Sequence, residues 1–190
     1  EPPARSLFIL TAPQPGDLLP TVASRCQHIR FNPISRAKLQ SWLRETHSLP
    51  ENEIDMIAAL AEGSTRRADA MVRTNYLNRR NWLISRIMKL SIKNLNHLLA
   101  LADNLSGNRD HLHDSLDIMQ SWMRDLLVHY YDPGKMMNVD LAGWVPPARA
   151  GWRPDAIIAK MKSIENARKC IEANTNPRLT CEALLIDIAG

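Results

Sequence analysis

The chain has 190 residues, of which 45% are hydrophobic, so it is long enough to bury a core in one domain or in two small ones. Its 24 Lys and Arg residues exceed its 20 Asp and Glu residues, and the net charge of +4 permits contact with nucleic acid without requiring it. Three widely spaced cysteines argue against a disulfide framework, and no apolar run approaches the roughly 18 residues of a membrane span. We therefore expect a cytoplasmic protein. The start at Glu1-Pro2-Pro3, without a methionine, leads us to expect a fragment of something longer.

The first 32 residues differ from the rest because they contain two strand-like runs. Residues 6–11 form an apolar run bounded by prolines, which is typical of a strand buried on both faces. Residues 27–31 alternate in polarity and predict a second strand. A short helix is expected between them at residues 18–23, with Asp17 as its cap. Two strands do not form a stable sheet alone, so this part is predicted to be the edge of a larger α/β domain.

A helical pattern begins after Asn32-Pro33 and predicts three short helices. Ser35 is suited to cap the first helix, and Pro50 precedes the second. Gly63 is placed to end the second helix in a left-handed conformation, and Ser64 to begin the third. We expect these short helices to pack on the segments next to them, because small domains bury a smaller fraction of their surface.

Longer helices are predicted from about Asn75 onward. Residues 142–154 are rich in glycine and proline and predict an ordered loop. The last helix is predicted to begin with Asn176 as its N-cap and Pro177 as its first residue, where the missing N–H costs nothing. The chain is therefore expected to be mainly α-helical.

A search for catalytic patterns finds none. The dipeptide Gly134-Lys135 is followed by Met136, so the hydroxyl residue that a phosphate-binding P-loop requires is absent. His111 and His113 are two residues apart and lie on different faces of a helix, which disfavours a shared metal site. We expect no catalysis by this chain alone, and neither a metal nor a cofactor bound to it.

The opening segment nevertheless resembles the C-terminal edge of an AAA+ nucleotide-binding domain from the clamp-loader family. In that family Glu-Pro-Pro is followed by a strand and then by Leu-Leu-Pro-Thr-Ile-x-Ser-Arg-Cys-Gln. The matching residues here are Glu1-Pro2-Pro3, residues 7–11 and residues 18–27, with Val22 in place of isoleucine.

The remainder resembles the lid and the collar of a clamp-loader subunit. Gly63-Ser64-Thr65-Arg66 matches a Gly-Ser-x-Arg sequence common in the lid. The segments that resemble the delta-prime type of bacterial DNA polymerase III are residues 122–127, Asn138, Asp140, residues 174–179, Glu182, Leu184 and Leu185. The implied domains are an AAA+ edge at residues 1–33, a three-helix lid at residues 34–75 and an all-helical collar at residues 76–190.

The resemblance implies a role for Arg25 as an arginine finger, which reaches in trans to the γ-phosphate of ATP and Mg²⁺ held by a neighbouring subunit. Ser24 and Cys26 are expected to orient its turn without chemistry of their own. Arg66 corresponds to the sensor-2 arginine, which touches nucleotide in its own subunit. It is equally compatible with a solvated helix residue.

Several other residues have two interpretations. Arg73, Arg79, Arg80 and Arg86 either line a basic face toward DNA or belong to solvated helix surfaces. Three tryptophans at helical spacing are expected in the core or in a subunit interface: Trp42, Trp82 and Trp122. Two more lie in the predicted loop and either contact another subunit or pack on their own domain: Trp144 and Trp152.

The function implied by the resemblance is that of a non-catalytic subunit that helps an ATP-driven loader place a sliding clamp on primed DNA. Its implied partners are other loader subunits through the collar, the clamp and primer-template DNA. Two alternatives remain: the C-terminal part of the gamma/tau ATPase subunit, and a free-standing helical interaction module.

Overall fold

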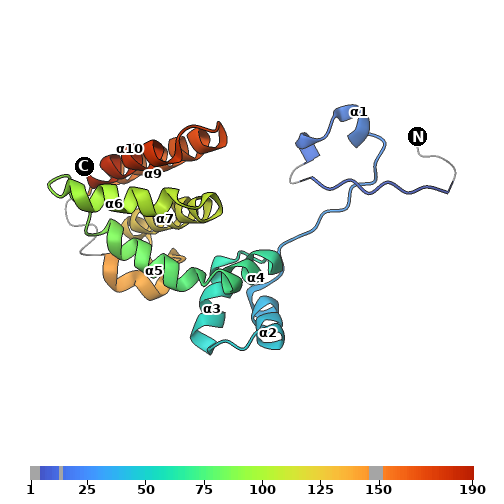
Figure 1. Ribbon diagram of the computed structural model, residues 1–190. Helices are drawn as coiled ribbons and strands as arrows, with labels where there is room; N and C mark the ends of the chain where they lie inside the picture. The colour runs from blue at the N-terminus through green and yellow to red at the C-terminus, as the bar shows by residue number, and fades with distance from the viewer. Residues whose placement is uncertain (1–4, 13–14, 146–151) are drawn as a thin grey trace. The chain divides into compact units, whose positions relative to one another are not determined.

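The computed structural model describes residues 5–12, 15–145 and 152–190. The chain divides into two compact units, Glu1–Pro33 and Ile34–Gly190, each of which is described by itself. Helices dominate the described residues, and none of them forms a strand. The prediction of a mainly α-helical chain is confirmed (Figure 1).

The two strands predicted in the first unit are not formed. Residues 6–11 and 27–31 are extended, and Leu7 and Phe31 are 84% and 90% exposed. A strand needs a partner to satisfy its backbone N–H and C=O groups, and the described part of this unit supplies none. The sequence pattern identified apolar segments suited to a sheet, but the sheet itself depends on pairing that local sequence does not provide.

The short helix of the first unit begins later than predicted. Asp17 lies in a 3-10 turn, η1 (Pro15–Asp17), and the helix α1 (Pro20–Ala23) begins with Pro20 at its first position. Leu19 is the N-cap residue and makes no side-chain cap bond. The prediction of Asp17 as the cap was wrong, because the proline sets the start of the helix at a position where no N–H is needed.

The second unit begins with three short helices in mutual contact, which are α2 (Arg36–Thr46), α3 (Glu51–Leu60) and α4 (Thr65–Arg73). The Ser35 side chain accepts a hydrogen bond from the Lys38 N–H, and the Ser64 side chain accepts one from the Arg67 N–H. Gly63 has a φ of 79°, in the left-handed region that a side chain disfavours. The predicted caps of α2 and α4 are confirmed. Gly63 is left-handed as predicted, but the first left-handed residue after α3 is Glu62, with a φ of 50°.

The rest of the second unit is built from longer helices, with two 3-10 turns between α7 and α9. The longer helices are α5 (Tyr76–Ile87), α6 (Leu95–Ser106), α7 (Arg109–Tyr131), α9 (Pro154–Glu172) and α10 (Pro177–Ala189). The 3-10 turns are η2 (Pro133–Lys135) and η3 (Val139–Trp144). α6 packs on α7, α7 on α9, α9 on α10, and α10 on α6, so these four helices form a closed bundle (Figure 1). α5 packs on α7 and joins the bundle to α4.

The loop predicted at residues 142–154 is partly replaced by helix. Its first residues belong to η3, and Pro154 is the first residue of α9. Residues 146–151 lie outside the described part of the chain. At the other end of the bundle Asn176 accepts hydrogen bonds from the Arg178 and Leu179 N–H groups, which confirms the predicted start of α10.

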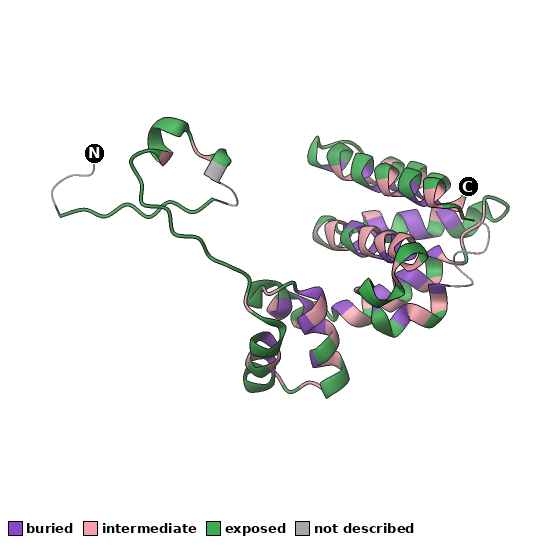
Figure 2. Ribbon diagram, turned by 180° about the vertical axis from the view of Figure 1, so that it is seen from behind, coloured by how far each residue is buried: buried purple, intermediate pink, exposed green. Residues whose placement is uncertain are grey.

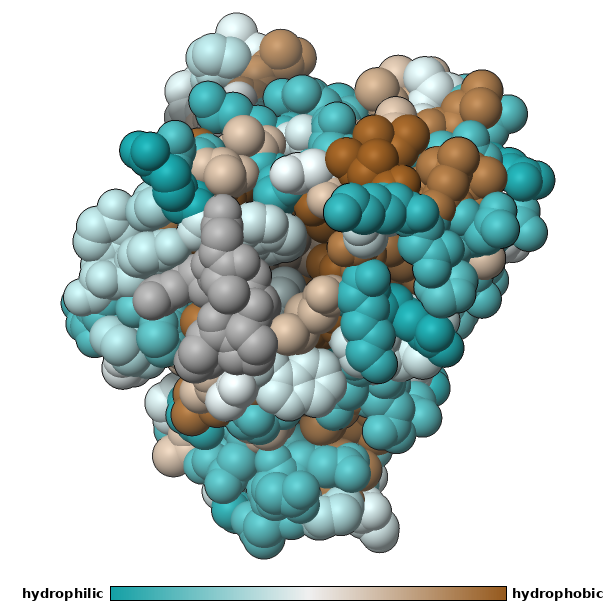
Figure 3. Space-filling view, turned by 90° about the vertical axis from the view of Figure 1, so that its left-hand side faces the viewer, coloured by the Kyte–Doolittle hydropathy of each residue, from teal (hydrophilic) through white to brown (hydrophobic). Residues whose placement is uncertain are grey.

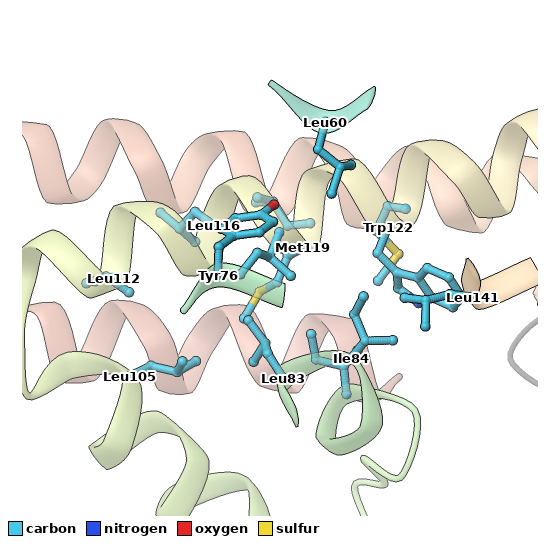
Figure 4. Close-up of a cluster of buried hydrophobic side chains, with 14 of the residues drawn as sticks. Leu60, Tyr76, Leu83, Ile84, Leu105, Leu112, Leu116, Met119, Trp122 and Leu141 are labelled. Atoms are coloured by element: carbon cyan, nitrogen blue, oxygen red, sulfur yellow. The ribbon is translucent and has the colours of Figure 1, made fainter. Parts of the chain in front are cut away.

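One hydrophobic core serves the whole second unit. Figure 4 shows Leu60 of α3 pointing toward a cluster in which Leu83 of α5 and Leu116 and Trp122 of α7 come together. Buried residues line the inward sides of the helices, and exposed residues line their outer sides (Figure 2). The short helices are therefore stabilised by packing on the longer ones, as their small size predicts.

The tryptophans take different places in this core. Trp122 is 1% exposed, as predicted for a core residue, whereas Trp82 is 40% exposed. Trp42, Trp144 and Trp152 are half-buried and pack against the core, so Trp144 and Trp152 follow the second of their two interpretations.

A buried lysine of α9 caps the C-terminal end of α10. The Lys160 ammonium of α9 donates hydrogen bonds to the backbone carbonyls of Asp187 and Ile188, at 3.0 and 2.8 Å, and lies 4.6 Å from the centre of the Trp152 ring. A cation at this position satisfies the last carbonyls and complements the negative end of the helix dipole. Burial lowers the pKa of Lys160, and the nearby Asp187 carboxylate opposes that shift.

Candidate functional site: an exposed arginine turn

Arg25 lies in a tight turn at the C-terminal end of α1. The Arg25 N–H donates to the Val22 carbonyl, at 3.0 Å, and the Cys26 N–H donates to the Ala23 carbonyl, at 3.2 Å. These bonds continue the winding of α1 for two residues, so the Arg25 side chain leaves the chain just past the helix. The Arg25 side chain is exposed.

Among the described residues, the hydrogen bond of the Arg25 guanidinium goes to its own turn. Its Nη1 donates a hydrogen bond of 2.6 Å to the Thr21 carbonyl, which also accepts a bond of 3.3 Å from the Ser24 hydroxyl. A hydrogen bond from a charged donor contributes about 1.5–3 kcal/mol at most, and exposure to water lowers that value. The guanidinium can exchange this bond for an external anion at small cost, and it presents further donors in a planar fork that matches phosphate oxygens.

The two neighbours of Arg25 belong to the same turn. Ser24 is the C-cap residue of α1, and its hydroxyl bonds the carbonyl of Thr21 one turn earlier. Cys26 contributes its backbone N–H, and its side chain is exposed. His28 was not singled out from the sequence; its Nε2 lies 3.0 Å from the Ala23 carbonyl and adds a further contact to this turn.

Arg66 lies in the other unit, so the two arginines are described separately. It is the second residue of α4 and is exposed. Arg67, which follows it, forms an ion pair of 2.7 Å with Glu62. Cations in the first turn of a helix face the positive end of its dipole, which is unfavourable. Glu62 offsets this effect for Arg67, and the described residues form no ion pair with Arg66.

Of the two interpretations of the four arginines, a basic face that includes all of them is not present. Arg80 is 1% exposed and forms an ion pair with Asp140, so it faces neither DNA nor solvent. Arg79 pairs with Asp114 at 3.0 Å and also donates to the His111 carbonyl. Arg73 of α4 pairs with Asp69 at 2.8 Å. Arg73 remains exposed in this pair, and Arg86 is also exposed and stacks over the Trp82 ring, at 5.9 Å from the ring centre.

The buried Arg80 belongs to a polar network that sequence reasoning did not find. Its Nη1 donates to the Asn138 side-chain oxygen at 3.0 Å, and its Nε and Nη2 donate to the Asn81 side-chain oxygen. Its Nη2 also pairs with Asp140. Each nitrogen of the guanidinium therefore has an acceptor, which a charge in a protein interior requires.

Asp125 of α7 completes this network. It is fully buried and accepts hydrogen bonds from the backbone N–H groups of Met137 and Asn138, at 2.9 and 2.6 Å. It accepts two more from the Asn138 side-chain amide and from Arg124. The network connects α5 and α7 to η3 and to the segment before it, so the motif residues Asn138 and Asp140 have a structural role.

The described residues contain no other candidate centre. Among them, no group of three or more His, Cys, Asp or Glu side chains is arranged to hold a metal ion. No helix in the described part of the chain is both long and apolar enough to cross a membrane.

Comparison with known proteins bears on the segment that holds the arginine turn. Residues 1–35 match the family described as "DNA polymerase III, delta subunit". None of the curated proteins matches the chain. The matched segment contains α1 and all three residues of the Ser24-Arg25-Cys26 turn. The match supports a relationship between this segment and the delta-type clamp-loader subunits of DNA polymerase III.

Proposed function

We propose that the chain is the C-terminal part of a delta-prime subunit of the DNA polymerase III clamp loader. In this role it is not an ATPase, and it helps the loader place a sliding clamp on primed DNA. The observation that carries the proposal is the exposed Arg25 guanidinium at the end of α1, inside the segment that matches the delta-subunit family.

Arg25 would act on ATP and Mg²⁺ bound by a neighbouring subunit. The guanidinium is permanently charged, and an arginine delivered in trans stabilises the charge that develops on the transferred phosphoryl group. Because one hydrogen bond, to the Thr21 carbonyl, holds the Arg25 side chain among the described residues, it is able to turn toward such a phosphate when subunits close. ATP hydrolysis would then depend on subunit assembly.

Exposed apolar residues of the first unit support its assignment as the edge of an AAA+ core. Leu7, Ile9 and Phe31 are 84%, 80% and 90% exposed in extended segments. Such segments pair readily with the edge of a sheet, because their backbone groups and apolar side chains are both unsatisfied.

The helical bundle would serve as the collar that joins this subunit to others. Three exposed apolar residues lie near the start of α6 and the end of α10: Ile92, Leu95 and Ile186. Figure 3 shows apolar side chains gathered on one face, bordered by hydrophilic ones. A rimmed apolar area of this kind is typical of a protein–protein interface.

The test is the ATPase activity of a loader reconstituted with full-length subunits. Arg25→Ala is expected to lower DNA-stimulated ATP hydrolysis at the site that faces it, by up to about 10³-fold. Arg25→Lys keeps the charge and loses the planar fork, so it should restore part of the activity. Arg30→Ala, an exposed arginine of the same unit, is the matched control and should leave hydrolysis unchanged. Wild-type hydrolysis in the Arg25→Ala loader would contradict the proposal.

One observation favours the gamma/tau alternative. Arg66, in the Gly-Ser-x-Arg sequence, is exposed at the start of α4. If the chain is part of an ATPase subunit, Arg66→Ala in the full-length protein should weaken nucleotide binding by that same subunit. A delta-prime subunit that holds no hydrolysable nucleotide should show no such change. A free-standing helical module should fail to assemble with loader subunits at all.

A further inference from the structure

Residues 70–102 of the second unit carry only basic charges, and ion pairs account for half of them. Residues 70–102 contain no Asp or Glu, and all of their charged residues are basic: Arg73, Arg79, Arg80, Arg86, Lys89 and Lys93. The first three of these pair with carboxylates that lie outside residues 70–102: Asp69, Asp114 and Asp140. The last three are exposed, and the described residues provide no carboxylate that pairs with them.

Arg86 lies on the exposed side of α5, and Lys89 and Lys93 follow the end of this helix. Within α5 the exposed residues are Asn78, Trp82 and Arg86, which are four positions apart and therefore lie on one side of the helix. The Lys89 N–H donates to the Arg86 carbonyl at 3.1 Å, so Lys89 extends the last turn. Lys93 lies in the connection to α6, which follows directly (Figure 1).

Trp82 gives this surface a second chemical character. Its indole is 40% exposed although the Arg86 guanidinium stacks over it. Exposure of a large aromatic ring to water is unfavourable, and the other tryptophans with described side chains are buried or half-buried against the core. An aromatic ring beside unpaired cations is the combination that binds single-stranded nucleic acid, because the bases stack while the cations meet phosphates.

We propose that Trp82, Arg86, Lys89 and Lys93 form a contact surface for single-stranded DNA, which we call the α5 face. The three cations would meet backbone phosphates, and a base would stack on the indole. The inference rests on the proposed function for the choice of DNA over other polyanions. An acidic peptide would use the same cations but has no base to stack on Trp82.

The test is direct binding of the chain to a fluorescein-labelled oligo-dT of about 20 nucleotides, long enough to cover the roughly 4–16 nucleotides of a typical site. Fluorescence anisotropy over a range of salt concentrations gives the affinity and its salt dependence. Replacing Arg86, Lys89 and Lys93 together by Gln should weaken the salt dependence. The magnitude of the slope of log affinity against log salt should fall by about 2, because each lost phosphate contact removes about 0.7.

A charge-matched triple variant is the control. Lys38, Lys135 and Lys162 are exposed on α2, η2 and α9, and their replacement by Gln removes the same net charge from separate elements. This variant should keep the wild-type slope. Equal losses in the two triple variants would mean that general positive charge attracts the DNA, and would overturn the assignment of the α5 face.

Trp82 is tested by two substitutions. Trp82→Ala should weaken oligo-dT binding about tenfold, whereas Trp82→Phe keeps an aromatic ring and should retain most of the affinity. Neither should change binding of a duplex of the same length, whose bases are already stacked. Loss of binding in Trp82→Phe equal to that in Trp82→Ala, or a duplex bound as tightly as oligo-dT, would overturn the stacking contact.

Two further outcomes also overturn the proposal. One is no binding of oligo-dT at low salt by the wild-type chain. The other is preferential binding of poly-glutamate through the same three cations. These measurements need no ATPase and no other loader subunit, so a failure here leaves the Arg25 test undecided. Failure of the Arg25 test likewise leaves direct DNA binding to be measured.

Discussion

The three cysteines differ sharply in their surroundings. Cys26 and Cys170 are exposed, whereas Cys181 is 1% exposed in the core beside α6 and α9. Burial, with a smaller contribution from Glu182, raises the pKa of the Cys181 thiol to about 11. The thiolate is the reactive form, so Cys181 should be protected both by its burial and by its protonation.

Thiol labelling of the native chain at about pH 8 should therefore modify Cys26 and Cys170 rapidly and Cys181 only after unfolding. A Cys26→Ser/Cys170→Ser variant is the control and should show no rapid phase. Rapid labelling of that variant in its native state would contradict the burial of Cys181.

The raised pKa of Cys181 also sets the sign of a pH effect. Because its folded-state pKa lies above its ordinary value of 9.0, its contribution to stability is fully present below that value and is lost as the pH rises toward about 11. Replacing Cys181 by Ala should remove this part of the alkaline loss of stability, as measured by urea unfolding at several pH values.

At the scale of helices, the Arg80–Asp125 network fixes the relative positions of elements, which non-directional apolar packing alone does not specify. Asp125 receives two backbone N–H groups of the segment before η3, and Arg80 binds Asn138 from the other side. Removal of one partner from a buried charged network leaves the others desolvated and unpaired.

Asp125→Ala should therefore lower the free energy of unfolding by about 3–5 kcal/mol, measured by urea denaturation. Asp117→Ala is the matched control on the same helix, because Asp117 is half-exposed in its pair with Arg168 and should contribute at most about 1 kcal/mol. Equal unfolding midpoints for the two variants would show that the network adds no stability.

The helix boundaries were the part of the fold most readily predicted from sequence. Ser35, Ser64 and Asn176 cap their helices as their residue types predict, because capping depends on neighbours within three residues. The strands at residues 6–11 and 27–31 were predicted from equally regular patterns and are not formed. The difference is physical: a helix satisfies its own backbone, whereas a strand requires a partner.

The molecule consists of two units, and the buried hydrophobic core of the described residues belongs to the second. Every buried residue of the hydrophobic core lies in the second unit, from Leu39 to Ile188. The described apolar residues of the first unit are mostly exposed, including Leu7 and Phe31. The stability of the second unit should therefore be independent of the first.

Removal of residues 1–33 is expected to leave the unfolding midpoint of residues 34–190 unchanged, within about 0.5 kcal/mol in free energy. Circular dichroism during urea titration provides the measurement. Leu116→Ala in the full chain shows that the assay is sensitive, since loss of this buried side chain should cost about 2–5 kcal/mol. A lower midpoint for the shortened chain would mean that the first unit supports the second.

The sequence by itself determined the helices, most of their caps and the segment that carries Arg25, because all three depend on residues close together in the chain. Tertiary structure alone decided which basic residues remain on the surface. Arg79 and Arg80 are neighbours of the same type, yet their carboxylate partners, Asp114 and Asp140, lie 35 and 60 positions away. Arg86 meets no such partner in the described chain and stays in solvent beside Trp82. The charge of a side chain is set by its type, but its exposure depends on what distant segments bring to it.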